Sequence, residues 1–179
     1  MSLHEFAKQF RFDAIPSAER SDHLPAAVAA HLPEQDVIVF PVADAHSDTA
    51  NFSERYGFSL EDCANTLVLK YTKEGADHYA AVVALGSRRL DVNGAVKEAL
   101  GARRLSFAKR EVATELTGME FGGITAFGLP AGMRILIDQA VMDRQFVVMG
   151  AGYRRTKLLL ATAALAGLAD AQVAPLALP

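Results

Sequence analysis

The sequence predicts a single mixed α/β (α+β) domain in which short helices alternate with strands and hairpins. Residues 37–42 and 66–71 are rich in β-branched and apolar side chains, whereas residues 92–100 have the spacing of a helix. With 179 residues, 51% hydrophobic, the chain can bury one sizeable core and is too short for two full domains. We expect residues 1–24 to form an N-terminal extension and residues 25–179 to form the domain.

Local signals place each expected element in turn. Pro25 suits the first turn of a helix, and Gly57 suits the left-handed residue that ends one. Ser59 with Asp62 resembles a capping box before a strand, and the turn KEGAD separates that strand from a hairpin partner. The helices are expected over residues 25–32, 47–56, 92–100 and 110–116, the strands over residues 37–42, 66–71, 78–85, 135–137 and 146–149, and a strand followed by a helix over residues 158–168.

Composition excludes several classes of protein. The longest strongly apolar stretch, residues 158–169, is shorter than the ~18 to 20 residues that cross a bilayer. The N-terminus lacks the continuous apolar segment of a secretory signal, and Cys63 is the one cysteine, which excludes an internal disulfide or a multi-cysteine zinc site. We therefore expect a cytoplasmic protein without a bound metal.

Charge is unevenly distributed along the chain, whose net charge is −3. Residues 1–87 carry a net charge of −7 and residues 88–157 carry +5. We expect an ordinary solvated surface here, with phosphate binding as the alternative, because Lys and Arg supply most of the sequence-independent affinity for nucleic acid. Its basic residues include Arg88, Arg89, Lys97, Arg103, Arg104, Lys109, Arg110, Arg154, Arg155 and Lys157.

Glycines gather in one part of the chain. Seven of the 13 glycines stand between residues 118 and 152. Glycine permits positive φ and lets backbone N–H groups approach a ligand, which favours a site that binds a carbonyl, carboxylate or phosphate; tight turns at strand ends are the alternative. Neither GxGxxG after a strand nor the P-loop GxxxxGK[ST] is present, so the usual nucleotide-binding motifs are excluded.

Three segments of the chain resemble a known family. The sequence GMEFGGITAFG at residues 118–128, followed by ILID at 135–138, is similar to the glycine-rich signature of the YbaK/ProX aminoacyl-tRNA deacylases, the free-standing relatives of the editing domain in bacterial prolyl-tRNA synthetases. GFSLEDCANTLVL at residues 57–69 and HYAAVVALGSRRLDVNGAVKEALGARRLSFA at residues 78–108 agree with the same family in order and spacing. The resemblance covers residues 45–173.

The resemblance implies a mixed, partly barrel-like sheet flanked by helices, with a pocket for the aminoacyl end of a mischarged tRNA. The implied reaction is ester hydrolysis in trans, by glycine-rich backbone donors and a lysine at the start of the central strand, without cofactor or metal. The implied partners are the acceptor end of aminoacyl-tRNA and, optionally, an aminoacyl-tRNA synthetase. Two alternatives stay open: a binding protein that does not hydrolyse its ligand, and a relative that shares only the fold.

The chain departs from the family pattern at two positions. Asn65 stands where relatives have the lysine of a KTL motif, and an amide donates a hydrogen bond but supplies neither charge nor acid–base chemistry. Lys70 lies five residues further on, and odd spacing in a strand puts it on the opposite face. After Gly150, where many relatives have an acidic residue, the chain reads GAGYRRTKL, with Thr156 and Lys157 near that place. The sequence alone is therefore compatible with an active and with an inactive enzyme.

The expected site residues follow from the resemblance. As catalytic groups we expect the amides of Gly122 and Gly123, which would stabilise an oxyanion, and Asn65, which would orient the acyl group or ribose. Cys63 is expected to be a small buried hydrophobe rather than a nucleophile, and His46 to belong to a helix-capping turn. Expected substrate-binding residues are Gly118, Phe121, Thr125, Asp138, Gly150 and Gly152, with a structural role as the alternative for Thr125 and Asp138.

Overall fold

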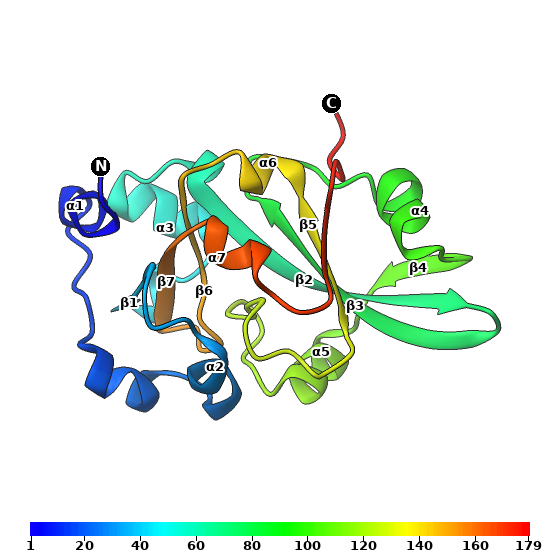
Figure 1. Ribbon diagram of the computed structural model, residues 1–179, viewed down its shortest axis with the longest axis horizontal. Helices are drawn as coiled ribbons and strands as arrows, with labels where there is room; N and C mark the ends of the chain where they lie inside the picture. Colours follow the sequence, from blue (N-terminus) through cyan, green and yellow to red (C-terminus); the bar gives the residue numbers. More distant parts are fainter.

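The computed structural model describes residues 1–179 and is built on one mixed sheet (Figure 1). The strands are β1 (Val37–Pro41), β2 (Cys63–Lys73), β3 (Ala76–Leu85), β4 (Arg104–Phe107), β5 (Arg134–Asp138), β6 (Phe146–Gly150), β7 (Thr156–Ala161) and β8 (Ala171–Ala174). Their order is β1-β7-β6-β2-β3-β5-β8, with β4 paired to β2 outside that path. The mixed sheet flanked by helices confirms the expected fold class, and because β1 and β8 do not pair, the sheet does not close into a barrel.

Short helices and turns surround this sheet. The α-helices are α1 (Leu3–Gln9), α2 (Ala26–His31), α3 (Thr49–Tyr56), α4 (Lys97–Leu100), α5 (Arg110–Thr117), α6 (Gln139–Met142) and α7 (Ala163–Ala166), with short helical turns at Ser17–His23, Asp44–His46, Leu60–Asp62 and Val92–Val96. Gly57, Gly101 and Gly118 end α3, α4 and α5 in the left-handed conformation, which confirms the helix end predicted at Gly57. None of the helices has the length and apolar character needed to cross a membrane.

The register of the central strands brings distant parts of the chain together. β2 and β3 form a long antiparallel hairpin that projects at the right of Figure 1. The start of β2 runs parallel to the end of β6, with Cys63 opposite Val148 and Ala64 opposite Met149. β6 and β7 are antiparallel, with Gly150 opposite Lys157. The first residues of β2, the last of β6 and the first of β7 therefore lie side by side.

Residues 1–24 pack against the sheet. α1 lies beside β1 and β7, and Phe12 is buried with its ring stacked on Phe40 at a centroid distance of 4.2 Å. Ile15 donates its backbone N–H to the carbonyl of Val39 at 2.7 Å. The segment expected to be an extension thus contributes to the core under α1 and α3, because its aromatic side chains cover one face of β1 and β7.

Candidate functional site

A mostly apolar cavity of about 370 Å³ opens where the starts of β2 and β7 meet the end of β6. It lies between α3 on one side and α5 with the glycine-rich loop (residues 118–128) on the other. Its apolar wall comprises Phe52, Cys63, Ala64, Leu67, Val68, Phe107, Ala108, Ala113, Phe121, Ile124, Val148 and Met149. Its remaining lining residues are Asp48, Thr49, Asn65, Thr66, Gly122, Gly150 and Lys157. Few polar groups facing an otherwise apolar hollow are typical of a small-ligand site.

Asn65 lies at the start of β2 with its side chain on this cavity. The hydroxyl of Thr49, in the first turn of α3, donates a hydrogen bond to Asn65 Oδ1 at 2.7 Å. This bond fixes the amide plane and leaves Nδ2 without a protein acceptor. Asn65 therefore keeps two free N–H donors on a residue that lines the cavity, as a residue that orients an acyl or ribose oxygen needs.

The two adjacent glycines of the loop differ in what their amides do. Gly123 donates its N–H to the carbonyl of Glu120 at 2.9 Å, and its carbonyl accepts the N–H of Gly152 at 2.7 Å. A Cβ at Gly123 would lie 2.8 Å from the carbonyl carbon of Tyr153, so this glycine allows two backbones to approach closely. Gly122 has no such partner and lines the cavity. Of the two amides expected as oxyanion donors, that of Gly122 is therefore free within the protein, whereas that of Gly123 is already hydrogen-bonded to Glu120.

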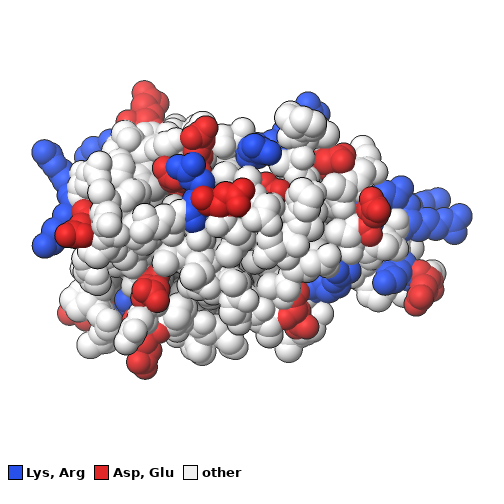
Figure 2. Space-filling view, turned by 45° about the horizontal axis from the view of Figure 1, so that its top comes forward, with Lys and Arg blue, Asp and Glu red and all other residues white.

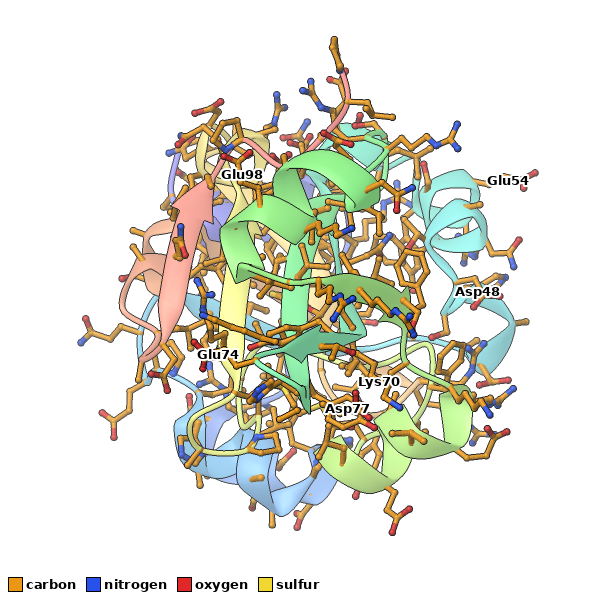
Figure 3. All side chains as sticks on the ribbon, turned by 90° about the vertical axis from the view of Figure 1, so that its right-hand side faces the viewer. Asp48, Glu54, Lys70, Glu74, Asp77 and Glu98 are labelled. Atoms are coloured by element: carbon orange, nitrogen blue, oxygen red, sulfur yellow. The ribbon has the colours of Figure 1, made fainter.

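Arg154 braces the mouth of the cavity between α3 and the glycine-rich loop. Its Nε lies 3.0 Å from Asp44 Oδ1 and its Nη1 lies 3.2 Å from Asp48 Oδ1, and these carboxylates, Asp44 first, raise the pKa of the guanidinium. Gly122 has φ +88°, and a Cβ there would fall against the same guanidinium. Figure 3 shows Asp48 at the start of α3. The guanidinium that these ion pairs hold thus lies directly against Gly122.

Lys157 is the charged side chain that the cavity buries. Only 6% of it is exposed, it makes no ion pair or hydrogen bond, and its Nζ lies 5.2 Å from the centroid of the Phe52 ring. Loss of hydration lowers the pKa of Lys157 to about 8. The sequence showed that Lys157 lies near the place after Gly150 where the chain departs from the family pattern. It did not show that Lys157 would be buried, because its burial depends on the pairing of β6 with β7.

Cys63 also lines the cavity and lies within the core. Burial raises the pKa of its thiol to about 12, so the thiol stays protonated at neutral pH. Its Sγ donates weakly to the carbonyl of Ser59 at 3.5 Å. These features suit the small buried hydrophobe that we expected and do not suit a nucleophile.

The other expected residues divide into two groups. Phe121 and Gly150 line the cavity, whereas Gly118, Thr125, Asp138 and Gly152 do not. Asp138 Oδ1 instead accepts the backbone N–H of Leu176 at 2.8 Å, and Thr125, within the loop, is fully buried. Gly118 ends α5, and a Cβ at Gly152 would collide with Pro25. Gly118, Thr125 and Gly152 thus belong to the glycine-rich loop and its surroundings, whereas Asp138 anchors the segment after β8.

Lys70 lies outside the site, as its spacing from Asn65 predicted. Its Nζ forms an ion pair with Asp77 Oδ2 at 3.2 Å across the hairpin, and both side chains are largely exposed. Figure 3 shows the two side chains together on the surface of the hairpin. No cation from β2 itself therefore reaches the cavity.

Exposed aromatic rings border the mouth. Phe107 is 55% exposed and Phe121 is 44% exposed, and the guanidinium of Arg110 lies 5.2 Å from the Phe121 ring centroid. Lys109 is exposed beside them. Figure 2 shows further Lys and Arg side chains at its right-hand end, which the β2–β3 hairpin occupies in Figure 1. Sequence reasoning identified these basic residues but not Phe107, because an exposed ring on a short edge strand has no local signature.

Comparisons with known proteins agree on the architecture. A model of the aminoacyl-tRNA editing domain family matches residues 44–168. A candidate trans-editing enzyme for prolyl-tRNA synthetase has a solved structure with a TM-score of 0.71 and 21% identity, covering 93% of this chain and 100% of its own. A scaffold protein used for epitope grafting has a TM-score of 0.74 and 21% identity over 92% of this chain and 99% of its own. A hypothetical protein has a TM-score of 0.67 and 23% identity over 98% and 99%. At these identities the solved structures establish the fold.

Proposed function

This chain belongs to the aminoacyl-tRNA editing domain family, and we propose that its cavity binds the acyl group of a mischarged tRNA and hydrolyses the ester. The observation that supports this proposal most strongly is the pairing of an apolar cavity with free hydrogen-bond donors at its mouth. The amide of Gly122 and Nδ2 of Asn65 are both unpaired within the protein, and both residues line the same cavity. An acyl side chain and its ester carbonyl require this combination.

The reaction is the addition of water to the ester carbonyl carbon. The carbonyl oxygen gains negative charge in the tetrahedral intermediate, where the Gly122 N–H stabilises it, and Asn65 orients the acyl group or the ribose. The bond from carbon to the ribose oxygen then breaks, that oxygen takes up a proton, and a free amino acid and uncharged tRNA leave. A neighbouring ribose hydroxyl of the tRNA lies close to the ester and is suited to help activate the water, which lessens the need for a protein base.

The substrate class follows from the cavity wall. Phe52, Val68, Val148 and Met149 surround the space that an amino acid side chain would fill, and no charged carboxylate lies deep in it. An apolar acyl group would therefore be favoured over a polar one. One methylene changes the free energy with which a hydrophobic pocket binds a side chain by only about 1–3 kcal/mol. Discrimination against shorter homologous side chains should therefore be modest.

The mouth is suited to the unpaired acceptor end of tRNA. Exposed rings such as Phe107 and Phe121 stack on bases irrespective of sequence, and Arg110 and Lys109 beside them attract phosphates. We propose the acceptor end as the bound part of tRNA, the cytoplasm as the place of action, and a synthetase as an optional partner that presents the substrate.

A panel of correctly and incorrectly charged tRNAs, assayed by single-turnover deacylation, tests the proposal. We expect hydrolysis of at least one tRNA that carries an apolar non-cognate amino acid. Ala108→Phe, which fills the cavity, should abolish that hydrolysis, and Ala131→Phe, at an exposed position outside the cavity, should not. Binding without hydrolysis by the wild-type protein would instead establish a binding protein and refute the enzymatic proposal.

A further inference from the structure

We propose that Lys157 is a catalytic residue of this cavity, whose ammonium reaches across Gly150 and donates a hydrogen bond to the carbonyl oxygen of the bound ester. The inference rests on the proposed deacylation and adds to it the group that supplies positive charge. It assigns that role to β7, although the family resemblance implied a lysine at the start of β2, where this chain has Asn65.

The sheet register brings Lys157 and Asn65 into one row. Gly150 pairs with Lys157, and continuing the parallel register of Ala64 with Met149 by one residue places Asn65 beside Gly150. Residues in one row of neighbouring strands point to the same face, and strands are ~4.8 Å apart. Lys157 and Asn65 thus stand on either side of a residue that has no side chain. The four-carbon stem of the lysine can extend over Gly150 toward the space beside Asn65.

The surroundings leave the ammonium without a partner of its own. The groups that face it are the ring of Phe52 and the carboxylate of Asp48 from α3 and its N-cap, the thiol of Cys63 from β2, and the guanidinium of Arg154 from the loop after β6. Asp48 Oδ1 forms an ion pair with Arg154 Nη1 at 3.2 Å, and the Cys63 thiol is neutral. An unpaired ammonium against an apolar wall is costly, so a bound group that offers an oxygen would be stabilised there.

Charge at this point favours the transition state over the ester. A carbonyl oxygen gains negative charge only as water adds, so a nearby cation in a partly dehydrated cavity strengthens its interaction during the reaction. Asn65 and the Gly122 amide are neutral donors and supply the direction of the hydrogen bonds. The pKa of Lys157, about 8, leaves the ammonium as the main form at neutral pH and removes it above that value.

The test compares single-turnover deacylation of the preferred mischarged tRNA by four proteins. Lys157→Met should slow hydrolysis by about 10²- to 10³-fold, the usual loss on removing an oxyanion donor. Lys70→Met removes a lysine that faces away from the cavity and should hydrolyse at the wild-type rate. In the double variant Lys157→Met with Asn65→Lys, the new ammonium starts from the same row of the sheet. This variant should hydrolyse the ester at least tenfold faster than Lys157→Met alone.

A pH profile separates a chemical role from a structural one. After subtraction of spontaneous hydrolysis, the wild-type enzymatic rate should fall as pH rises through about 8, and the residual rate of Lys157→Met should not show that fall. Lys157→Met hydrolysing within threefold of the wild type, or sharing its pH profile, would overturn the inference while leaving the deacylase proposal intact. A wild-type protein that hydrolyses none of the charged tRNAs would instead refute the proposed function, and the inference with it. Thermal unfolding of each variant confirms that lost activity does not reflect lost folding.

Discussion

Replacing Lys157 by Met is expected to stabilise the protein near neutral pH. Burial lowers the pKa of Lys157 from its ordinary value of 10.5 to about 8. One pKa unit corresponds to about 1.4 kcal/mol, so keeping this side chain charged in the folded state costs about 3 kcal/mol of stability below pH 8. Methionine has a similar length and needs no hydration, so Lys157→Met should raise the free energy of unfolding at pH 7 by up to that amount.

The pH dependence of that gain follows from the direction of the pKa shift. Between pH 8 and pH 10.5 the unfolded chain binds more protons at this lysine than the folded protein does, so the lysine's contribution to wild-type stability rises with pH. The advantage of Lys157→Met over the wild type should therefore shrink by about 1 kcal/mol between pH 7 and pH 9. Urea denaturation of both proteins at the two pH values measures it. A variant less stable than the wild type at pH 7, or an advantage that does not change with pH, would refute this account of the buried ammonium.

Three further substitutions test the cavity and its support. Thr49→Val removes the 2.7 Å hydrogen bond to Asn65, so we expect a loss of about 1 kcal/mol in stability and slower deacylation, measured by thermal unfolding and single-turnover assay; an unchanged rate would show that the amide needs no anchor. Gly123→Ala places a Cβ 2.8 Å from the backbone of Tyr153 and should cost at least about 2 kcal/mol in urea denaturation, whereas a neutral effect would contradict the close approach. Phe12→Ala should cost about 3 kcal/mol or more if residues 1–24 belong to the folded unit, and a cost near zero would mean that they do not.

Local sequence signals were sufficient for most of the fold. The β-rich runs around residues 37–42 and 66–71 lie in β1 and β2, and the turn KEGAD lies in the β2–β3 hairpin. Glycine after a polar helical segment predicted helix ends correctly because few other residues adopt the left-handed conformation there at low cost. These signals depend on residues close together in the chain.

Long-range contacts explain what the sequence did not show. β4 and β8 are four-residue strands with largely exposed or small side chains, so they have no buried alternation to mark them. The packing of residues 1–24 depends on aromatic rings meeting β1 and α3, which lie elsewhere in the chain. Neither the pairing of these two short strands nor the packing of residues 1–24 produces a periodic pattern in the sequence of the segment concerned.

The site was predictable in outline and not in detail. The resemblance directed attention to Asn65 and the glycine-rich loop, and both border the cavity. Whether Gly122 or Gly123 has a free amide is decided by one turn hydrogen bond to Glu120, which composition does not reveal. The burial of Lys157 depends on its pairing with Gly150 across two strands. A charged residue in a basic stretch is ordinarily exposed, so its sequence context pointed to the surface.

The position of the deacylation site can be tested by a structure of the protein bound to an aminoacyl-adenosine whose ester is replaced by a stable amide. We expect the acyl side chain to fill the apolar cavity between Phe52 and Val68. We also expect the carbonyl oxygen to lie within hydrogen-bond distance of the Gly122 amide and Lys157 Nζ. An analogue bound elsewhere, or bound with its acyl group pointing to solvent while the cavity stays empty, would contradict the assignment of this cavity as the deacylation site.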